Sequence, residues 1–270
     1  MIAFKIWFSV LAFILGSSLG SFARLVAYRV SNGLSIIEPK SHCPECKKIL
    51  KPYDNIPIIS WIILGGKCRI CKASIGLFSL LIEISGGIVF MLAYLQYGNS
   101  FEDLPIFVAL NVLVFLFLII AAIDYETHNI YNISIIIYAV ISIFIFTYRV
   151  MFFDINPWSN IVGAIFGFTF FGTVKLVSKI VLKKDALGAG DVYLVGIGGL
   201  MIGFFPLLIS IIIATLLALI IEQIMIKSKE EKGSIEIAFA PYLLLGIAIM
   251  SIYGEMFVEY YWEVIMNVVT

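Results

Sequence analysis

Residues 104–126 read LPIFVALNVLVFLFLIIAAIDYE, an apolar run of membrane-spanning length that ends in two acidic residues. A bilayer core requires about 20 consecutive apolar residues per helix. Comparable runs recur along the whole chain, together with a shorter glycine-rich run at 192–205; the long ones cover residues 6–23, 77–97, 130–148, 158–174, 207–226 and 237–253. We therefore expect an all-α polytopic membrane protein with about eight transmembrane helices.

The composition supports this fold class. Of 270 residues, 61% are apolar and 13% are charged, whereas soluble domains have about 45–50% and 25%. These values exclude an ordinary soluble enzyme, a disordered tail and a basic nucleic-acid-binding domain. The expected partner is the lipid bilayer, and no nucleic acid is expected.

The basic residues predict the orientation. Of the 18 Lys and Arg residues, all except Lys5 and Arg149 fall in three stretches, 24–72, 175–184 and 227–232. With eight alternating spans these three stretches lie on one side. Because basic loops stay in the cytoplasm, we expect them to be cytoplasmic and both termini to face outward.

Four segments are expected along the chain. Residues 1–29 form a first transmembrane helix, which we interpret as retained and not as a cleaved signal peptide. Residues 30–75 form a cytoplasmic insert, and residues 76–256 form the main membrane domain. Residues 257–270 contain Tyr and Trp side chains typical of the membrane interface and predict an interfacial helix, with a ninth partial span as the alternative.

The insert carries two Cys-x-x-Cys motifs, Cys43-Pro44-Glu45-Cys46 and Cys68-Arg69-Ile70-Cys71. This pattern is typical of tetrahedral zinc bound by four thiolates, and a closed sulfur shell indicates a structural role. Two disulfides are the alternative, which a reducing cytosol disfavours. Iron is another. His42, next to Cys43, is a less favoured substitute ligand.

Two aspartates are predicted at one membrane face. Asp124 ends the third long run, and Asp191 begins the short glycine-rich run. Two close carboxylates share one proton and can perform aspartic-protease chemistry. Gly188 and Gly190, which lack Cβ atoms, would let a substrate or a facing helix approach closely. Helix caps or interfacial charges are the structural alternative for both aspartates.

A membrane-embedded glutamate and a pair of spaced glycines are two further features of the predicted spans. Glu83 lies within the second span, where charge is costly; we favour a protonated Glu that bonds neighbouring helices over a direct chemical role. Gly16-x-x-x-Gly20 predicts close helix packing.

These motifs resemble the type IV prepilin peptidases, the prepilin leader peptidase/N-methyltransferases of the Gly-x-Gly-Asp membrane protease family. The resemblance runs from about residue 16 to residue 246 and includes the cysteine insert. The further matching stretches are Gly20-Ser21-Phe22, Tyr28-Arg29, Asp54-Asn55-Ile56-Pro57, Gly188-Ala189-Gly190-Asp191 and Phe239-Ala240-Pro241-Tyr242.

The resemblance implies an enzyme that removes the short basic leader from prepilin-like proteins. Cleavage would occur at the cytoplasmic face of a bacterial inner or plasma membrane, with Asp124 and Asp191 as the catalytic residues. N-methylation of the new amino terminus from S-adenosylmethionine would follow. Glu126, close to Asp124, would attract the cationic leader.

Three positions depart from the family pattern: Tyr131 replaces Pro, Tyr193 replaces Lys and Arg24 replaces Asn. Arg24 lies in the amino-terminal region, which the family does not link to proteolysis, so a peptidase without methyltransferase activity is one alternative. A cation- or proton-coupled transporter and a non-catalytic secretion scaffold are alternatives from other classes.

Overall fold

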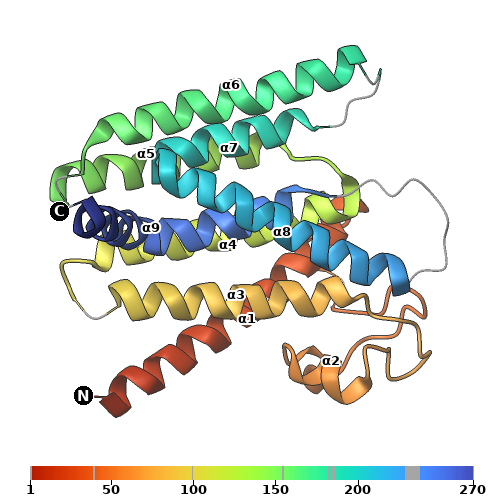
Figure 1. Cartoon of the computed structure of the whole chain (residues 1–270). Coiled ribbons are helices and arrows are strands. Elements are labelled where there is room, and N and C mark those ends of the chain that lie inside the picture. The colour runs from red at the N-terminus through yellow and green to blue at the C-terminus, as the bar shows by residue number, and fades with distance from the viewer. Residues whose placement is uncertain are drawn as a thin grey trace. The chain divides into compact units, whose positions relative to one another are not determined.

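The computed structural model describes residues 2–38, 40–98, 100–153, 155–181, 183, 187–228 and 238–269. Helices dominate this part of the chain, and two isolated β-bridges are its only β-pairing (Figure 1). The helices are α1 Ile2–Ser31, η1 Pro52–Asn55, α2 Ile59–Leu64, α3 Leu77–Tyr97, α4 Leu104–Thr127, α5 Asn132–Phe152, α6 Pro157–Val181, α7 Ala189–Ile202, α8 Phe204–Ser228 and α9 Ala240–Val269.

Seven of these helices are long and apolar enough to cross a membrane, and α7 is a shorter apolar helix. The expected all-α polytopic fold is therefore confirmed. The chain separates into two compact units, residues 1–128 and 129–270. This division differs from the four predicted segments, which remain predictions.

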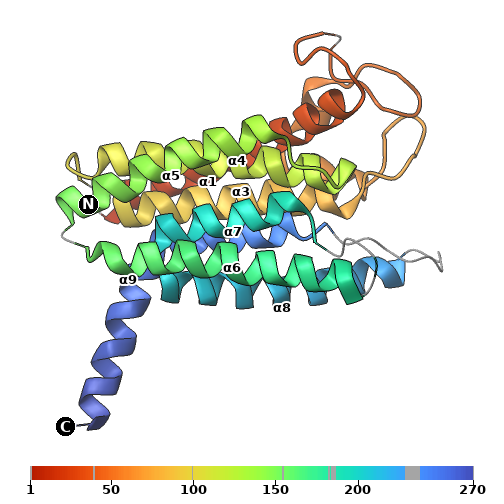
Figure 2. The same ribbon diagram turned by 90° about the horizontal axis from the view of Figure 1, so that it is seen from above.

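The amino-terminal unit packs α1, α3 and α4 together and carries the insert between α1 and α3 (Figure 2). Successive helices alternate in direction, so the insert lies at the end of the unit where α4 finishes. The predicted small-residue contact is confirmed here. A Cβ on Gly16 would lie 2.3 Å from the Gly86 carbonyl oxygen, and one on Gly20 would lie 2.7 Å from the Ile82 oxygen. Glycine therefore permits backbone contact between α1 and α3.

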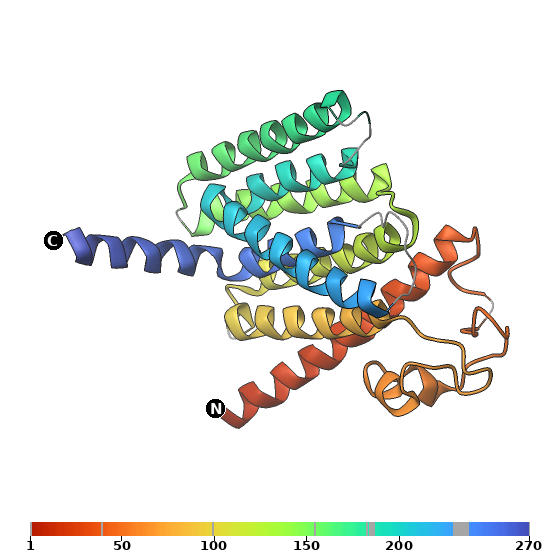
Figure 3. The ribbon, with the colours of Figure 1, turned by 45° about the vertical axis from the view of Figure 1, so that its right-hand side comes forward.

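The carboxy-terminal unit contains α5 to α9, with α7 packed against α5, α6 and α9 (Figure 3). The glycines of the short run serve this packing: a Cβ on Gly199 would lie 2.3 Å from the Gly163 carbonyl oxygen. The 14 residues of α7 correspond to about 21 Å of helix. Gly203, with φ +86°, ends α7, and α8 begins at the next residue.

Helix α9 continues from the last predicted span through Val269 as one helix. Its carboxy-terminal part projects away from α5–α8 (Figures 2 and 3). The sequence led us to expect a separate segment after residue 256. Its interfacial location remains a prediction.

Candidate active site and metal centre

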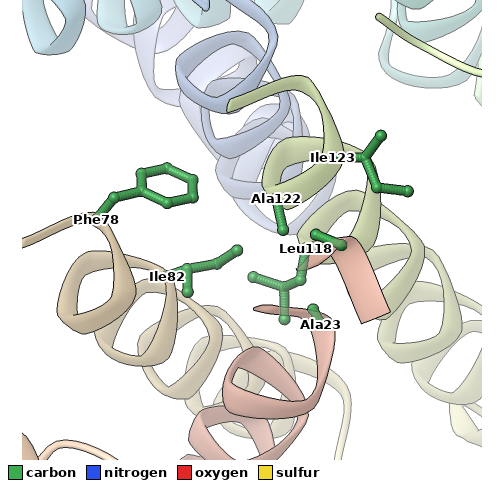
Figure 4. Close-up of a cluster of buried hydrophobic side chains, with 7 residues drawn as sticks. Ala23, Phe78, Ile82, Leu118, Ala122 and Ile123 are labelled. Carbon is green, nitrogen blue, oxygen red and sulfur yellow. The ribbon is translucent and has the colours of Figure 1, made fainter. Parts of the chain in front are cut away.

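Asp124 lies in the last turn of α4 and is 7% exposed. His128 follows in the left-handed region, with φ 51°, and its N–H donates to the Asp124 carbonyl oxygen at 2.8 Å. An apolar cluster holds this end of α4 against α1 and α3 (Figure 4). Its members are Ala23, Ala27, Phe78, Ile82, Leu118, Ala122 and Ile123. The Asp124 backbone is therefore fixed by core packing on the preceding turn.

Polar and aromatic contacts surround the residues just after Asp124. The Arg24 guanidinium forms an ion pair with Glu126, and its Nε–H donates to Ser79 Oγ at 3.3 Å. Tyr125 stacks on Phe78 with ring centroids 3.7 Å apart. Arg24 lies 5.6 Å from the Phe78 ring centroid, within cation–π range. We predicted that the negative charge of Glu126 attracts a leader. In the structure, the Arg24 guanidinium partly neutralises that charge.

Asp191 lies in the first turn of α7 and is 9% exposed. Gly188 is the N-cap residue of this helix, and a Cβ there would lie 3.2 Å from Asp191 Oδ2. A Cβ on Gly190 would lie 2.7 Å from Ile130 Cδ1. The Ile130 side chain, from the segment that leads into α5, thus approaches Gly190 closely. The approach of a substrate or a facing helix to this motif remains a prediction.

The two aspartates belong to different units, Asp124 to the first and Asp191 to the second. Each is buried at one end of an apolar helix. Their pairing as a catalytic dyad remains a prediction.

The four cysteines of the insert come together. One sulfur from each of Cys43, Cys46, Cys68 and Cys71 lies within 4.8 Å of the others. All four are free thiols, so the disulfide alternative is not realised in this structure. The Cys43 and Cys71 sulfurs are 3.8 Å apart, and tetrahedral zinc with Zn–S bonds of 2.3 Å requires about that separation. The donor set therefore fits a structural metal ion.

The two cysteine motifs share one backbone pattern. The Lys47 N–H donates to the Cys43 oxygen at 2.9 Å, and the Lys72 N–H donates to the Cys68 oxygen at 3.0 Å. Both lysines have positive φ, 57° and 62°. A bridge closes each turn, His42 with Ile49 and Lys67 with Ser74. The insert thus contains two equivalent knuckles, each supplying two sulfurs.

The second knuckle favours the charged form of one ligand, Cys68. Backbone N–H groups of Cys71 and Ile70 donate toward the Cys68 sulfur and lower the pKa of that thiol to about 7. Hydrogen bonds to a thiolate stabilise it. Arg69, between the second pair of cysteines, bonds Asp54 Oδ1 at 2.8 Å, and this bond raises the pKa of Arg69. The second knuckle is therefore tied to η1.

Glu83 bonds both the insert and a neighbouring helix. Its Oε2 accepts the Ile58 N–H at 2.7 Å. Its carboxylate also accepts a hydrogen bond from the Ser21 hydroxyl of α1, which is the expected bond between neighbouring helices. Ile58 has φ 64° and ψ −55°, and the Ile59 N–H donates across it to the Pro57 oxygen at 2.6 Å. This is a strained γ-turn at a β-branched residue. Glu83 thus holds an unfavourable backbone conformation in place.

Sequence reasoning missed three features: the Arg24–Glu126 pair, the Ile58 turn and the positive φ of Lys47 and Lys72. The spacing of the two Cys-x-x-Cys motifs could have indicated the matching lysine positions. No local sequence pattern predicts the Arg24–Glu126 pair or the Ile58 turn, because the residues that form these contacts are distant in sequence.

Both candidate sites lie in regions that match known protein families. Residues 14–97 match the bacterial peptidase A24 N-terminal domain, and residues 111–222 match the type IV leader peptidase family. The first match contains the cysteine centre, and the second contains both aspartates. No solved structure gives a significant match.

Similar curated proteins carry consistent names. A Myxococcus xanthus prepilin leader peptidase/N-methyltransferase is 31% identical over 84% of this chain and 65% of its own length. An Escherichia coli type 4 prepilin-like proteins leader peptide-processing enzyme is 30% identical over 88% of this chain and 91% of its own. A Bacillus subtilis prepilin leader peptidase/N-methyltransferase is 26% identical over 92% of this chain and 96% of its own length.

The matches cover both units and all the motifs that define the two candidate sites. The chain therefore belongs to the type IV leader peptidase family.

Proposed function

We propose that this protein removes the leader from prepilin-like proteins and then methylates the new amino terminus. The observation that carries the proposal is the burial of Asp124 and Asp191 at helix ends inside the segment that matches the peptidase family. The names of the relatives support both reactions. The basic loops support a plasma-membrane orientation with the insert in the cytoplasm.

The helix ends suggest different roles for the two carboxylates. Asp191 lies at the amino end of α7, where the helix dipole stabilises negative charge, and Asp124 lies at the carboxyl end of α4, where it does not. We assign Asp191 as the ionised base that takes a proton from the attacking water. Asp124, protonated, donates a hydrogen bond to the scissile carbonyl.

Proton balance completes the cleavage step. Water adds to the carbonyl carbon while its proton passes to Asp191. The departing nitrogen then requires a proton, and Asp191 returns the one it received. Water attacks directly, so no acyl-enzyme forms.

We assign the cysteine centre to zinc, with a structural role. Four thiolates would close the coordination shell and leave no position for substrate. Cys43, Cys46, Cys68 and Cys71 would hold the ion and fold an insert of about 45 residues that is too small for a secure core of its own.

S-adenosylmethionine is the methyl donor in this proposal. When bound, it supplies an electrophilic methyl group to the amine exposed by cleavage. The protein must hold that amine in its neutral form beside the donor, since an ammonium group has no lone pair.

Mass spectrometry tests both reactions. Detergent-purified protein is incubated with a prepilin, with and without S-adenosylmethionine, and the products are weighed. We expect leader loss in both samples and one added methyl group only with the donor. Leader loss without methylation would support the peptidase-only alternative. No leader loss, combined with an ion flux in proteoliposomes that Asp124→Asn abolishes, would support a transporter.

A further inference from the structure

Helix α7 carries Asp191, and its own sequence favours a helix only weakly. Four of its 14 residues are glycines: Gly190, Gly196, Gly198 and Gly199. Glycine inside a helix is less favourable than alanine, because its backbone loses more conformational freedom on folding. The conformation of α7 and the position of Asp191 therefore depend on the neighbouring helices.

These glycines bring α5 and α6 into direct contact with α7 (Figure 1). A Cβ on Gly196 would lie 2.5 Å from the Phe168 ring of α6. A Cβ on Gly198 would lie 3.0 Å from the Tyr138 hydroxyl oxygen of α5. Small residues let helices approach closely, but a helix face without side chains offers few projections that resist sliding or rotation. Directional contacts must therefore set the axial position of α7.

One directional contact comes from Tyr138 of α5. Its side chain is completely buried, and its hydroxyl donates to the Leu194 carbonyl oxygen of α7 at 3.3 Å. Leu194 lies three residues after Asp191, about one helical turn further along α7. Because Gly198 lacks a Cβ, the hydroxyl has room to reach this carbonyl.

A second directional contact comes from Asn160, near the start of α6. Its side chain is 4% exposed, and its Nδ2 group donates to the carbonyl oxygens of Leu200 at 2.9 Å and Met201 at 3.2 Å. Carbonyl groups in the last turn of a helix have no partner within that helix, and lipid supplies none. Asn160 therefore caps α7 and holds its carboxyl end.

The preceding residue, Ser159, holds the helix that follows. The Phe204 N–H, at the first residue of α8, donates to Ser159 Oγ at 3.3 Å. Ser159 and Asn160 thus bind both sides of the α7–α8 junction at Gly203. The junction cannot move along α6 unless these three hydrogen bonds break.

The buried polar groups of Tyr138 and Asn160 act on the same helix. Polar side chains are costly inside a membrane, and they tend to mark functional positions. Here both bond carbonyl oxygens of the helix that carries Asp191, one about a turn from it and the other at the opposite end. A displacement of about 1 Å at a catalytic group can reduce a rate about a hundredfold. The position of α7 therefore matters for any reaction at Asp191.

We propose that Tyr138 and Asn160 are positioning residues for leader cleavage. They hold α7 at the depth and rotation that the Asp191 carboxylate requires. The inference rests on the proposed peptidase function, in which Asp191 takes a proton from the attacking water. Both side chains act through α7 and not on the substrate, so their loss should slow the chemical step and leave substrate binding unchanged.

Steady-state cleavage of a prepilin by the purified protein in detergent tests this role. Tyr138→Phe removes only the hydroxyl and should lower kcat about three- to tenfold. Asn160→Leu keeps the side-chain size but removes two hydrogen bonds, and it should lower kcat about ten- to hundredfold. KM should stay within about twofold of the wild-type value in both variants. Asn160→Gln restores an amide donor and should regain part of the kcat that Asn160→Leu loses.

Two control variants remove the same polar groups elsewhere in the apolar helices. Asn111→Leu removes an asparagine of α4 whose Nδ2 group donates to the Phe107 oxygen of its own helix at 2.8 Å. Tyr148→Phe removes a hydroxyl from α5 and keeps a ring that stacks on Phe152 with centroids 4.6 Å apart. Both should keep the wild-type kcat. Rates are expressed per molecule in the monodisperse fraction from size-exclusion chromatography, so that loss of folded protein is not counted as loss of catalysis.

Hydrogen–deuterium exchange gives a readout that does not depend on the reaction. Peptides from Ala189–Ile202 should exchange several-fold faster in Asn160→Leu than in the wild type, because the end of α7 loses its cap. Peptides from α3, in the other unit, should exchange as in the wild type. Faster exchange in α7 together with a wild-type kcat would overturn the positioning role.

The outcomes separate this inference from the proposed function. Wild-type cleavage that Asp191→Asn abolishes, with unchanged kcat in Tyr138→Phe and Asn160→Leu, would overturn the positioning role while the peptidase assignment stands. Equal losses of kcat in Asn160→Leu and Asn111→Leu would also overturn it, because they would indicate general destabilisation. Wild-type protein that does not cleave a prepilin would overturn the proposed function itself.

Discussion

Arg24 and Glu126, which are 102 residues apart in the sequence, form an ion pair between α1 and the carboxyl end of α4. Glu126 lies two residues beyond Asp124. The contact therefore connects α1 to the end of α4 that carries Asp124.

Reversal of this pair tests its contribution. Arg24→Glu should lower prepilin cleavage several-fold, because it places two carboxylates together beside Asp124. The double variant Arg24→Glu/Glu126→Arg should regain most of the loss. Both side chains are about one-quarter exposed, 25% and 22%, so the pair contributes at most about 1 kcal/mol. Cleavage rates in low and high salt measure the effect, and a double variant no better than the single one would contradict it.

Removal of either proposed catalytic carboxylate should abolish cleavage. Asp124→Asn and Asp191→Asn keep the side-chain shape but lose the ionisable group, so each should reduce cleavage by at least about a thousandfold while membrane insertion stays normal. Gel-shift analysis of a prepilin after incubation with purified protein measures this loss. Retained cleavage in either variant would refute the assignment.

Zinc removal should affect folding more than proteolysis. Cys43→Ser should lower zinc content and expression, yet residual cleavage should exceed that of Asp124→Asn, because a closed four-sulfur site takes no part in the reaction. Metal analysis and cleavage assays on the same preparation make the comparison. Equal loss of cleavage in the two variants would indicate a catalytic metal.

The strained turn gives an unusual stability prediction. Ile58→Gly removes the penalty of φ 64°, so thermal stability should match or exceed that of the wild type by up to about 1 kcal/mol. The control is Ile62→Gly, at a position 63% exposed inside α2, which should cost about 1 kcal/mol. Differential scanning fluorimetry measures both variants, and equal destabilisation would argue against strain at Ile58.

A second ion pair stabilises the carboxy-terminal unit. Arg149 of α5 is 4% exposed, lies 3.6 Å from Glu255 of α9 and donates to the Ser251 oxygen. Glu255→Leu leaves this buried cation less compensated and should cost about 1–2 kcal/mol, since Glu255 itself is 42% exposed. Glu259→Leu, at an exposed position one turn further along α9, should cost much less. Melting temperatures in detergent test the difference, and equal shifts would show that the pair adds no stability.

The sequence predicted the membrane spans well, because the length of an apolar run can be read from the local sequence alone. Helix ends were harder: α1 continues to Ser31 and α9 to Val269, since helices extend beyond the apolar core into polar sequence. The cysteine cluster was predictable from spacing alone. The Glu83–Ile58 bond and the Arg24–Glu126 pair were not, because they depend on which distant segments pack together.

The shortness of α7 has a consequence for where hydrolysis takes place. Its carboxyl end joins α8 directly at Gly203, and the 25 residues of α8 are enough for a full crossing. If this junction lies at one membrane surface, the Asp191 end of α7 stops about 9 Å short of the opposite surface of a 30 Å core. Lipid cannot satisfy the polar groups at the Asp191 end of α7, so water or protein must surround them. A prepilin would then be cut in a small water-filled space below the level of the lipid headgroups. In a thicker bilayer this space would be deeper.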